Sequence, residues 1–166
     1  MIKLERNVSV ELKRENVNDI INEVKSQLEI LKRDRKLEIK LDKDMYCMVN
    51  KDQVKQIIYN LFQNVINHTD EVTGVISIST SHISNDSGSW IEVSIEDNGC
   101  GISEENIKLI FDRFYRIDKH RSRKRGGHGL GLSIVQRIIQ NHNGIINVES
   151  SEGKGSIFTF SFKEIE

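Results

Sequence analysis

The chain of 166 residues contains no proline, so glycine alone is left to mark the places where the backbone must turn sharply. Eight of its eleven glycines fall in three clusters: Gly99 with Gly101, four glycines within residues 126–131, and Gly153 with Gly155. Clusters of this kind indicate backbone that passes close to another group, which ordinary loops do not require. The three clusters therefore mark the points where the fold depends on close approach of the main chain.

Hydrophobic periodicity divides the sequence into segregated helices and strands. Asn50 followed by Gln53 is a capping-box signature that predicts a helix over residues 51–68. Further helices are predicted at 17–33, from Ser103 toward Phe111, and from near Leu130 to Asn143-Gly144, and strands at 37–41, 45–49, 74–82, 89–97, 145–150 and 156–162. Because the two kinds of element do not alternate strictly, we expect an α+β fold with an antiparallel or mixed sheet and the helices on one face.

Length and composition are those of one soluble domain, with 37% hydrophobic and 30% charged residues. No run of about 18 apolar residues is present, and the N-terminus lacks the apolar region of a signal peptide. Cys47 and Cys100 have no metal-ligand spacing, and they favour a reduced chain over a disulfide-bonded one. We therefore expect a cytoplasmic location without direct membrane insertion.

The net charge of −1 conceals one strongly basic segment. Residues 113–125 hold seven arginines or lysines and one aspartate, a local charge of +6 that leaves −7 for the remainder. Such a segment is typical of a solvated, mobile loop or of an anion-binding one, with nucleic acid as a third interpretation. Because the chain as a whole is not basic, nucleic-acid binding is the weakest of these interpretations.

The predicted helix 51–68 carries a stripe of amides beside its apolar face. Asn60, Asn64 and Asn67 are four and then three residues apart, so their side chains point the same way. A carboxamide offers an oxygen to a hard cation and an NH2 group to phosphate oxygens. The stripe therefore indicates either a binding site or a polar boundary of the core.

A carboxylate occupies the apolar face of the predicted strand 89–97. Alternation places Asp97 on the same face as Ile91, Val93 and Ile95, where a carboxylate is costly without a partner. Two glycines follow at once in 97-DNGCG-101. This pattern indicates an acceptor for a ligand's amino group, or a turn that ends the strand.

Residues 126–135, GGHGLGLSIV, run from a glycine-rich loop directly into an apolar helix. Backbone amides and the positive end of a helix dipole make such a junction an anion site. The segment is not a Walker A loop, because no Gly-Lys-Ser/Thr follows, and not a Rossmann loop, because a basic segment precedes it in place of a strand. Together with the cations upstream, it favours polyphosphate as the ligand.

Five segments in order, 60-NLFQNVINH-68, 97-DNGCG-101, 110-IFDRFYR-116, 126-GGHGLGL-132 and 153-GKGSIFTF-160, resemble the N, G1, F, G2 and G3 boxes of a known domain. That domain is the ATP-binding catalytic domain of bacterial sensor histidine kinases, within the gyrase, Hsp90, histidine kinase and MutL superfamily. The resemblance covers about residues 50–160, and the flanking helix extends it to about residue 15. It implies a two-layer α/β sandwich of the Bergerat type, with a mobile ATP lid over residues 103–125.

The resemblance also implies roles for particular residues. Asn64 would hold Mg²⁺ with Asn60 in support, and Asp97 would accept a hydrogen bond from the adenine amino group. The base pocket would be formed by Gly99, Gly101, Ile102 and Thr159. The phosphate site would be formed by Arg116, Gly127, Gly129, Leu130 and Gly131. Phe111 and Phe114 would anchor the lid.

The end of the first box departs from the family pattern. Val65 stands where the family often has alanine, and Asn67 and His68 stand where it often has lysine followed by tyrosine or histidine. Loss of the lysine weakens one expected phosphate contact, although Asn67 can still donate a hydrogen bond. His68 either contacts the nucleotide or packs against the apolar face.

Asn60 separates two kinds of chemistry. Gyrase-like and Hsp90-like members, and related serine kinases, have a glutamate base four residues before the Mg²⁺ asparagine, and that position is Asn60 here. Because an amide accepts no proton at neutral pH, the resemblance implies transfer of the γ-phosphate to an outside histidine. The same residue disfavours an anti-sigma-type serine kinase.

The phosphoacceptor segment of such kinases, which is similar to His-Glu-Leu-Arg, has no counterpart around the histidines at 68, 82, 120, 128 and 142. We therefore expect residues 15–166 to be the catalytic domain, and residues 1–14 to be the tail of a preceding dimerisation helix or linker. The implied partners are ATP, the dimerisation and phosphotransfer domain and, indirectly, a response regulator. The alternative is a degenerate module that binds nucleotide, or a partner protein, without phosphotransfer.

Overall fold

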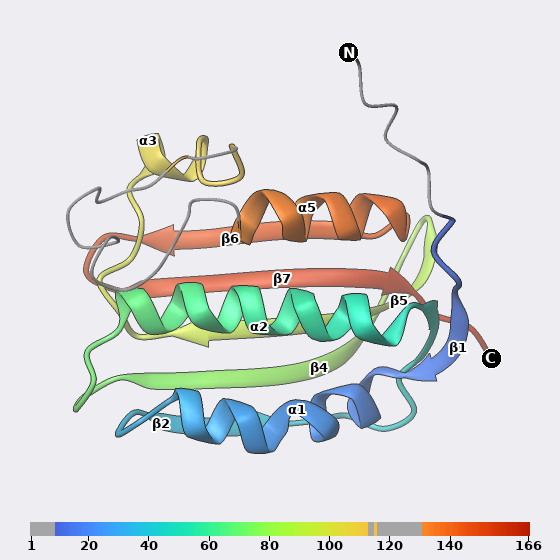
Figure 1. Cartoon of the computed structure of the whole chain (residues 1–166). Helices are drawn as coiled ribbons and strands as arrows, with labels where there is room; N and C mark the ends of the chain where they lie inside the picture. The colour runs from blue at the N-terminus through green and yellow to red at the C-terminus, as the bar shows by residue number, and fades with distance from the viewer. Residues whose placement is uncertain (1–8, 113–114, 116–130) are drawn as a thin grey trace, which may run out of the picture.

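The structure, a computed structural model, describes residues 9–112, 115 and 131–166. Its elements in chain order are β1 Lys13–Asn16, α1 Val17–Leu31, β2 Lys36–Lys40, β3 Tyr46–Val49, α2 Lys51–His68, β4 Val75–Asn85, β5 Gly88–Asp97, α3 Glu104–Ile107, α5 Gly131–Asn141, β6 Ile145–Ser151 and β7 Gly155–Lys163. Helices α1, α2 and α5 lie across one face of a five-stranded sheet, which gives a two-layer sandwich (Figure 1).

The five-stranded sheet has the strand order β2-β4-β5-β7-β6. Strands β2 and β4 run parallel, whereas the pairs β4–β5, β5–β7 and β6–β7 are antiparallel. The prediction of an α+β fold with a mixed, mostly antiparallel sheet and helices on one face is therefore confirmed.

Strand alternation builds one half of the core, and helical spacing builds the other. Ile91, Val93 and Ile95 of β5 are fully buried, and each pairs with a buried phenylalanine of β7. Helix α2 packs against this layer through Val54, Ile57, Ile58, Leu61, Phe62 and Val65. Burial of each large apolar side chain contributes roughly 1.5–3 kcal/mol, so α2 is fixed on the sheet by the face that adjoins its amide stripe.

The start of α2 is tied to the end of α5 by one buried histidine. Asn50 caps α2 as predicted, because its Oδ1 accepts from the Gln53 amide at 3.0 Å. The backbone amide of Asn50 donates to Nε2 of His142 at 3.1 Å, and Nδ1 of His142 lies 2.7 Å from the carbonyl oxygen of Ile138. These two bonds assign the neutral Nδ1–H tautomer, which donates to α5 and accepts from α2.

A small second sheet was not predicted. Lys13–Asn16 forms β1, which pairs antiparallel with β3, so the predicted strand 45–49 lies outside the main sheet. The Arg14 guanidinium lies 3.8 Å from the centre of the Tyr46 ring and holds the two strands together. Strand β1 begins two residues before the expected domain boundary at residue 15. The assignment of residues 1–14 to a preceding helix or linker stays a prediction.

Two further elements differ in length from their predictions. The β4–β5 hairpin continues to the pair Asn85–Gly88, because strand pairing persists beyond the predicted end at residue 82. The helix expected from Ser103 is the single turn α3, and hydrogen-bonded turns carry the chain on toward Phe111. Most of the expected lid, residues 113–114 and 116–125, lies outside the described residues, so the mobile lid stays a prediction.

We expect His142→Ala to lower the free energy of unfolding by about 2–3 kcal/mol. The substitution leaves the Asn50 amide without its acceptor and removes a ring that packs 5.5 Å from the Phe162 ring, centroid to centroid. Urea denaturation would measure the loss. The exposed neighbour Asn141 supplies the control, since Asn141→Ala should change stability by no more than about 0.5 kcal/mol. Equal effects of the two substitutions would contradict the bridging role of His142.

Candidate functional site

The last turns of α2 present the amide stripe at the end of the sandwich where α3 and the start of α5 also lie (Figure 1). Asn60, Asn64 and Asn67 are all partly exposed beside the buried face of the helix. The Asn60 Nδ2 atom lies 3.4 Å from the carbonyl oxygen of Gly131, at the start of α5. Within residues 9–112, 115 and 131–166, the Asn64 carboxamide has no hydrogen-bond partner. Its oxygen is therefore available to a ligand.

Asp97 ends β5 on the face that the helices cover. It is 5% exposed and follows Ile91, Val93 and Ile95 in the alternation, as predicted. Its Oδ1 accepts from the Gly99 amide at 2.8 Å, and the Ser156 amide also donates to the carboxylate. Burial raises the pKa of Asp97 to about 6, although both backbone donors act in the opposite direction. The two hydrogen bonds therefore replace only part of the hydration that the carboxylate loses on burial.

The segment that follows Asp97 joins the carboxylate to the amide stripe. The Cys100 amide donates to the carbonyl oxygen of His68 at 3.1 Å. A side chain at Gly99 would begin only 2.1 Å from that same oxygen, so the glycine permits this approach. His68, the last residue of α2, is thereby held beside the turn that carries Asp97.

The first and third glycine clusters interlock. A Cβ atom at Gly155, whose φ is +96°, would lie 1.9 Å from the carbonyl oxygen of Asp97. At Gly101, whose φ is +72°, a Cβ atom would lie 2.0 Å from the carbonyl oxygen of Ser151. The group that these glycines approach is thus another stretch of main chain. They shape the site by bringing β7 against the turn after β5.

Beyond this turn the chain re-enters the core. Ile102 is 3% exposed, and its amide donates to Oγ of Ser150 at 2.7 Å. Phe111 packs against the core, and the Tyr115 hydroxyl donates to Oδ1 of Asn106. These contacts hold the described part of the expected lid, residues 103–112 and 115, against the rest of the domain.

The structure does not bring Thr159 to this group. Thr159 pairs with Ser94 and Asn147 on the face of the sheet opposite the helices, away from the Asp97 carboxylate. The neighbour of Asp97 in β7 is Ser156, which is 5% exposed and was not predicted as a site residue. Its Oγ lies 2.8 Å from Oγ of Ser150.

Several expected phosphate-site residues lie outside the described residues, namely Arg116, Gly127, Gly129 and Leu130, as does the expected lid anchor Phe114. Their roles stay predictions. Gly131 is described, and it begins α5 as the predicted junction requires.

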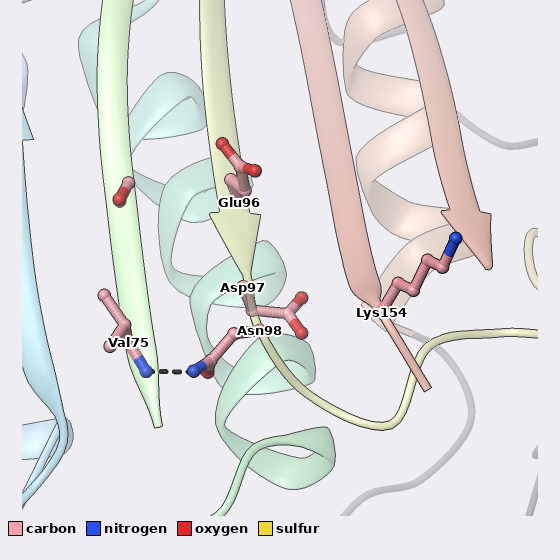
Figure 2. A pocket seen from close by; sticks show the side chains of 6 residues that line it. Val75, Glu96, Asp97, Asn98 and Lys154 are labelled. Carbon is pink, nitrogen blue, oxygen red and sulfur yellow. Dashed lines mark hydrogen bonds between the residues drawn. The ribbon is translucent and has the colours of Figure 1, made fainter. Parts of the chain in front are cut away.

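A shallow hollow lies at the end of the sheet where β5 ends. It is lined by Val75, Ser77, Glu96, Asp97, Asn98 and Lys154. Figure 2 shows Glu96 and Lys154 on this side, and the Asp97 carboxylate pointing away from β4. Two of the lining residues are joined, because Oδ1 of Asn98 accepts from the Val75 amide at 2.8 Å. The residues that line the hollow include Asp97 but none of the amide stripe of α2.

The described residues also limit the other kinds of site. They contain no cluster of three or more His, Cys, Asp or Glu side chains that could hold a metal ion. None of their helices is long and apolar enough to cross a membrane. Cys47 and Cys100 are both free thiols, and burial raises the pKa of Cys47 to about 12.

The two-layer sandwich, with a buried carboxylate and a helical amide stripe at one end, places the chain among nucleotide-binding ATPase domains. It belongs to the family of histidine kinase-, DNA gyrase B-, and HSP90-like ATPases, whose profile matches residues 49–166. The sensor histidine kinase WalK of Bacillus subtilis (strain 168) is 38% identical over 120 residues, which are 72% of this chain and 19% of WalK. The chain thus spans about a fifth of the length of that relative.

Solved histidine kinase structures share the fold. The catalytic domain of histidine kinase ThkA, in a nucleotide-free form, matches with a TM-score of 0.76 and 30% identity, over 92% of this chain and 95% of that one. A structure of ThkA in complex with the response regulator protein TrrA matches with a TM-score of 0.72 and 28% identity, over 91% of this chain and 41% of that one. The chain is therefore similar, in sequence and in fold, to the catalytic domains of sensor histidine kinases.

We expect Asp97→Asn to stabilise the chain at pH 8 but not at pH 4. Because the pKa of Asp97 is raised to about 6, the folded state binds this proton more tightly than the unfolded state does. The free energy of unfolding therefore falls as the pH rises from about 4 through 6, by up to about 3 kcal/mol, and a neutral amide avoids this loss. Thermal melts across this range would reveal the gap between variant and wild type. Asp86→Asn, at an exposed turn, is the control, and a gap independent of pH would contradict the raised pKa.

Proposed function

We propose that this chain binds Mg-ATP and donates the γ-phosphate to a histidine on a separate dimerisation and phosphotransfer domain. The observation that carries the proposal is that a buried Asp97 carboxylate and the Asn64 carboxamide, which has no hydrogen-bond partner in the described part of the chain, lie at the same end of the sandwich. One group suits a base amino group and the other suits a cation, so a ligand with both ends matches the pair.

In this proposal Asp97 accepts a hydrogen bond from the adenine amino group. The buried carboxylate lacks water, and an N–H donor would replace what burial removed. Gly99, Gly101 and Ile102 form the turn against which the base would lie, and Ser156 takes the neighbouring position in β7. Specificity for adenine follows, because a base with a carbonyl oxygen at that position would leave the carboxylate unpaired.

Asn64 would provide a side-chain oxygen to Mg²⁺, with Asn60 in support. The carboxamide oxygen is a hard donor of the kind that Mg²⁺ accepts, and phosphate oxygens and water would complete the shell. Asn67 and His68, in the following turn, would face the phosphates, together with Gly131 at the start of α5. Mg²⁺ would neutralise the charge that develops at the γ-phosphate.

Phosphotransfer is favoured over hydrolysis by Asn60. Its amide accepts no proton, and its Nδ2 already lies 3.4 Å from the Gly131 carbonyl oxygen, so it cannot activate water. A neutral imidazole needs no such base to attack, since one ring nitrogen holds a free electron pair. That nitrogen would bond to the γ-phosphorus as the bond to the bridging oxygen breaks and ADP leaves, and the ring would release its other proton to solvent.

The partners follow from the same chemistry. The acceptor histidine would belong to the dimerisation domain of a longer kinase, and the phosphohistidine would serve a response regulator, as the likeness to ThkA in complex with TrrA supports. Dependence on ATP would place the domain in the cytoplasm.

Calorimetric titration with a non-hydrolysable ATP analogue, with and without Mg²⁺, tests the pocket. We expect Asp97→Asn to weaken binding by about 10- to 100-fold, because a hydrogen bond to a charged acceptor is lost. Asn64→Ala should abolish the gain in affinity that Mg²⁺ gives to the wild type. Asn22→Ala, at an exposed position of α1, is the matched control and should bind as the wild type does. A folded wild type that binds no analogue at millimolar concentration would support the degenerate module instead.

Phosphotransfer itself is tested by mixing the chain with a histidine-bearing dimerisation domain of its parent kinase and labelled ATP. We expect acid-labile phosphohistidine on the added domain and slow release of free phosphate by the chain alone, because Asn60 supplies no base. Asn64→Ala should reduce the labelling along with the Mg²⁺ response. Nucleotide binding without any phosphohistidine, at every concentration of the acceptor domain, would refute the transfer step.

A further inference from the structure

Arg35 is a buried arginine in the loop that joins α1 to β2, and it is 6% exposed. That loop lies on the other side of α2 from α3 and α5 (Figure 1). Its Nη2 donates to the carbonyl oxygens of Thr69 at 2.9 Å and Ile66 at 3.1 Å, and its Nε donates to Oγ1 of Thr69 at 3.0 Å. A further bond joins Nη1 to the carbonyl oxygen of Lys32 at 3.3 Å. The guanidinium thus binds the end of α2 and the end of α1 together.

The acceptors explain why a guanidinium is needed. Carbonyl oxygens in the last turn of a helix have no partner within the helix, and they carry the negative end of its dipole. Thr69 extends the contact inward, because its Oγ1 donates to the carbonyl oxygen of Val65 at 2.9 Å. A planar fork of five N–H groups can serve several such acceptors at once, whereas a lysine ammonium offers one nitrogen. Arg35 therefore fixes the turn that contains Val65, Ile66 and Thr69.

The same turn is also held by the segment that follows Asp97. The His68 carbonyl oxygen accepts from the Cys100 amide, and Gly99 packs against that oxygen. The last turn of α2 thus contacts both Arg35 and residues 99–100. Asn64 adjoins Val65, so the position of this turn determines how far the amide stripe is from the carboxylate.

We propose that Arg35 is a positioning residue that sets the spacing between the amide stripe of α2 and the Asp97 carboxylate. The inference rests on the proposed function, in which these groups take opposite ends of one nucleotide. A ligand that spans both ends depends on this spacing. A ligand that contacts Asp97 alone does not, so the two kinds of ligand separate positioning from mere stability.

The test compares the affinities of two ligands. The first is the Mg²⁺ complex of a non-hydrolysable ATP analogue, measured by calorimetry, and the second is adenosine, measured by nuclear magnetic resonance titration. We expect Arg35→Ala to weaken binding of the analogue by about tenfold or more, and binding of adenosine by no more than about twofold. A small displacement of the last turn of α2 lowers the affinity only of the ligand that spans both groups. Arg35→Lys should restore part of the difference. All titrations are made well below the melting temperature of each variant.

Two controls distinguish positioning from stability. Val24→Ala removes a side chain of α1 that is 1% exposed, so it should lower the melting temperature without changing either affinity. Arg14→Ala removes an arginine that stacks on Tyr46 in the small sheet, and it should leave the affinities for both ligands unchanged. If Arg35→Ala does not fold, Thr69→Val removes only the Oγ1 link, and it should show the same difference in smaller degree.

The outcomes separate the two proposals. Equal loss of both ligands, no loss of either, or the same split in Val24→Ala would overturn the role of Arg35 while leaving the nucleotide site intact. Failure of the wild type to bind the analogue would overturn the proposed function itself, and the positioning role with it.

Discussion

The carboxylate of Asp97 lies at the end of an apolar strand, where two backbone amides compensate only part of the water that it loses. Everything around it is arranged to hold the main chain in that place. Gly155 lets the backbone of β7 pass within contact distance of the Asp97 carbonyl oxygen, and Gly99 lets the His68 carbonyl oxygen approach from α2. The result is a buried charge, whose lost hydration costs stability in the free protein and which suits a ligand that donates an N–H group.

Helix α2 serves both the core and the site, so the accuracy of the site follows from the packing of the core. Its apolar face is fixed against the sheet, and its two ends are fixed by different polar clamps. His142 accepts from the Asn50 amide at the start of the helix, and Arg35 donates to the carbonyl oxygens of its last turn. Asn60 and Asn64 stand between these clamps. Their displacement along or around the helix axis would require one clamp to break, which is how a fold places weakly interacting amides reproducibly.

Local periodicity predicted the elements that bury one face in the core between the helices and the sheet. The predicted helix 51–68 coincides with α2, and period-2 alternation placed Asp97 on the buried face of β5. The same rule, applied from Phe158 and Phe160 back along β7, would have assigned Ser156 to the face of Asp97 and Thr159 to the opposite one. Strand β1 could not be found this way, because Lys13–Asn16 has no apolar alternation and is ordered by its pairing with β3. Arg35 also had no local signal for its contact with α2, since its acceptors there belong to Ile66 and the cap residue Thr69, more than thirty residues away.

The sequence by itself determined the type and buried face of the main helices and strands, and the five ordered segments that mark the family. Those properties depend on side-chain spacing within about ten residues, which is readable without the fold. Only the tertiary structure decided the strand order β2-β4-β5-β7-β6, the interlocking of Gly155 with Asp97, and the clamping of α2 by Arg35 and His142. In each of these, at least one partner is a main-chain atom of a residue that is distant in sequence. Every residue carries those same atoms whatever its side chain, so the residue letters alone do not identify the partner.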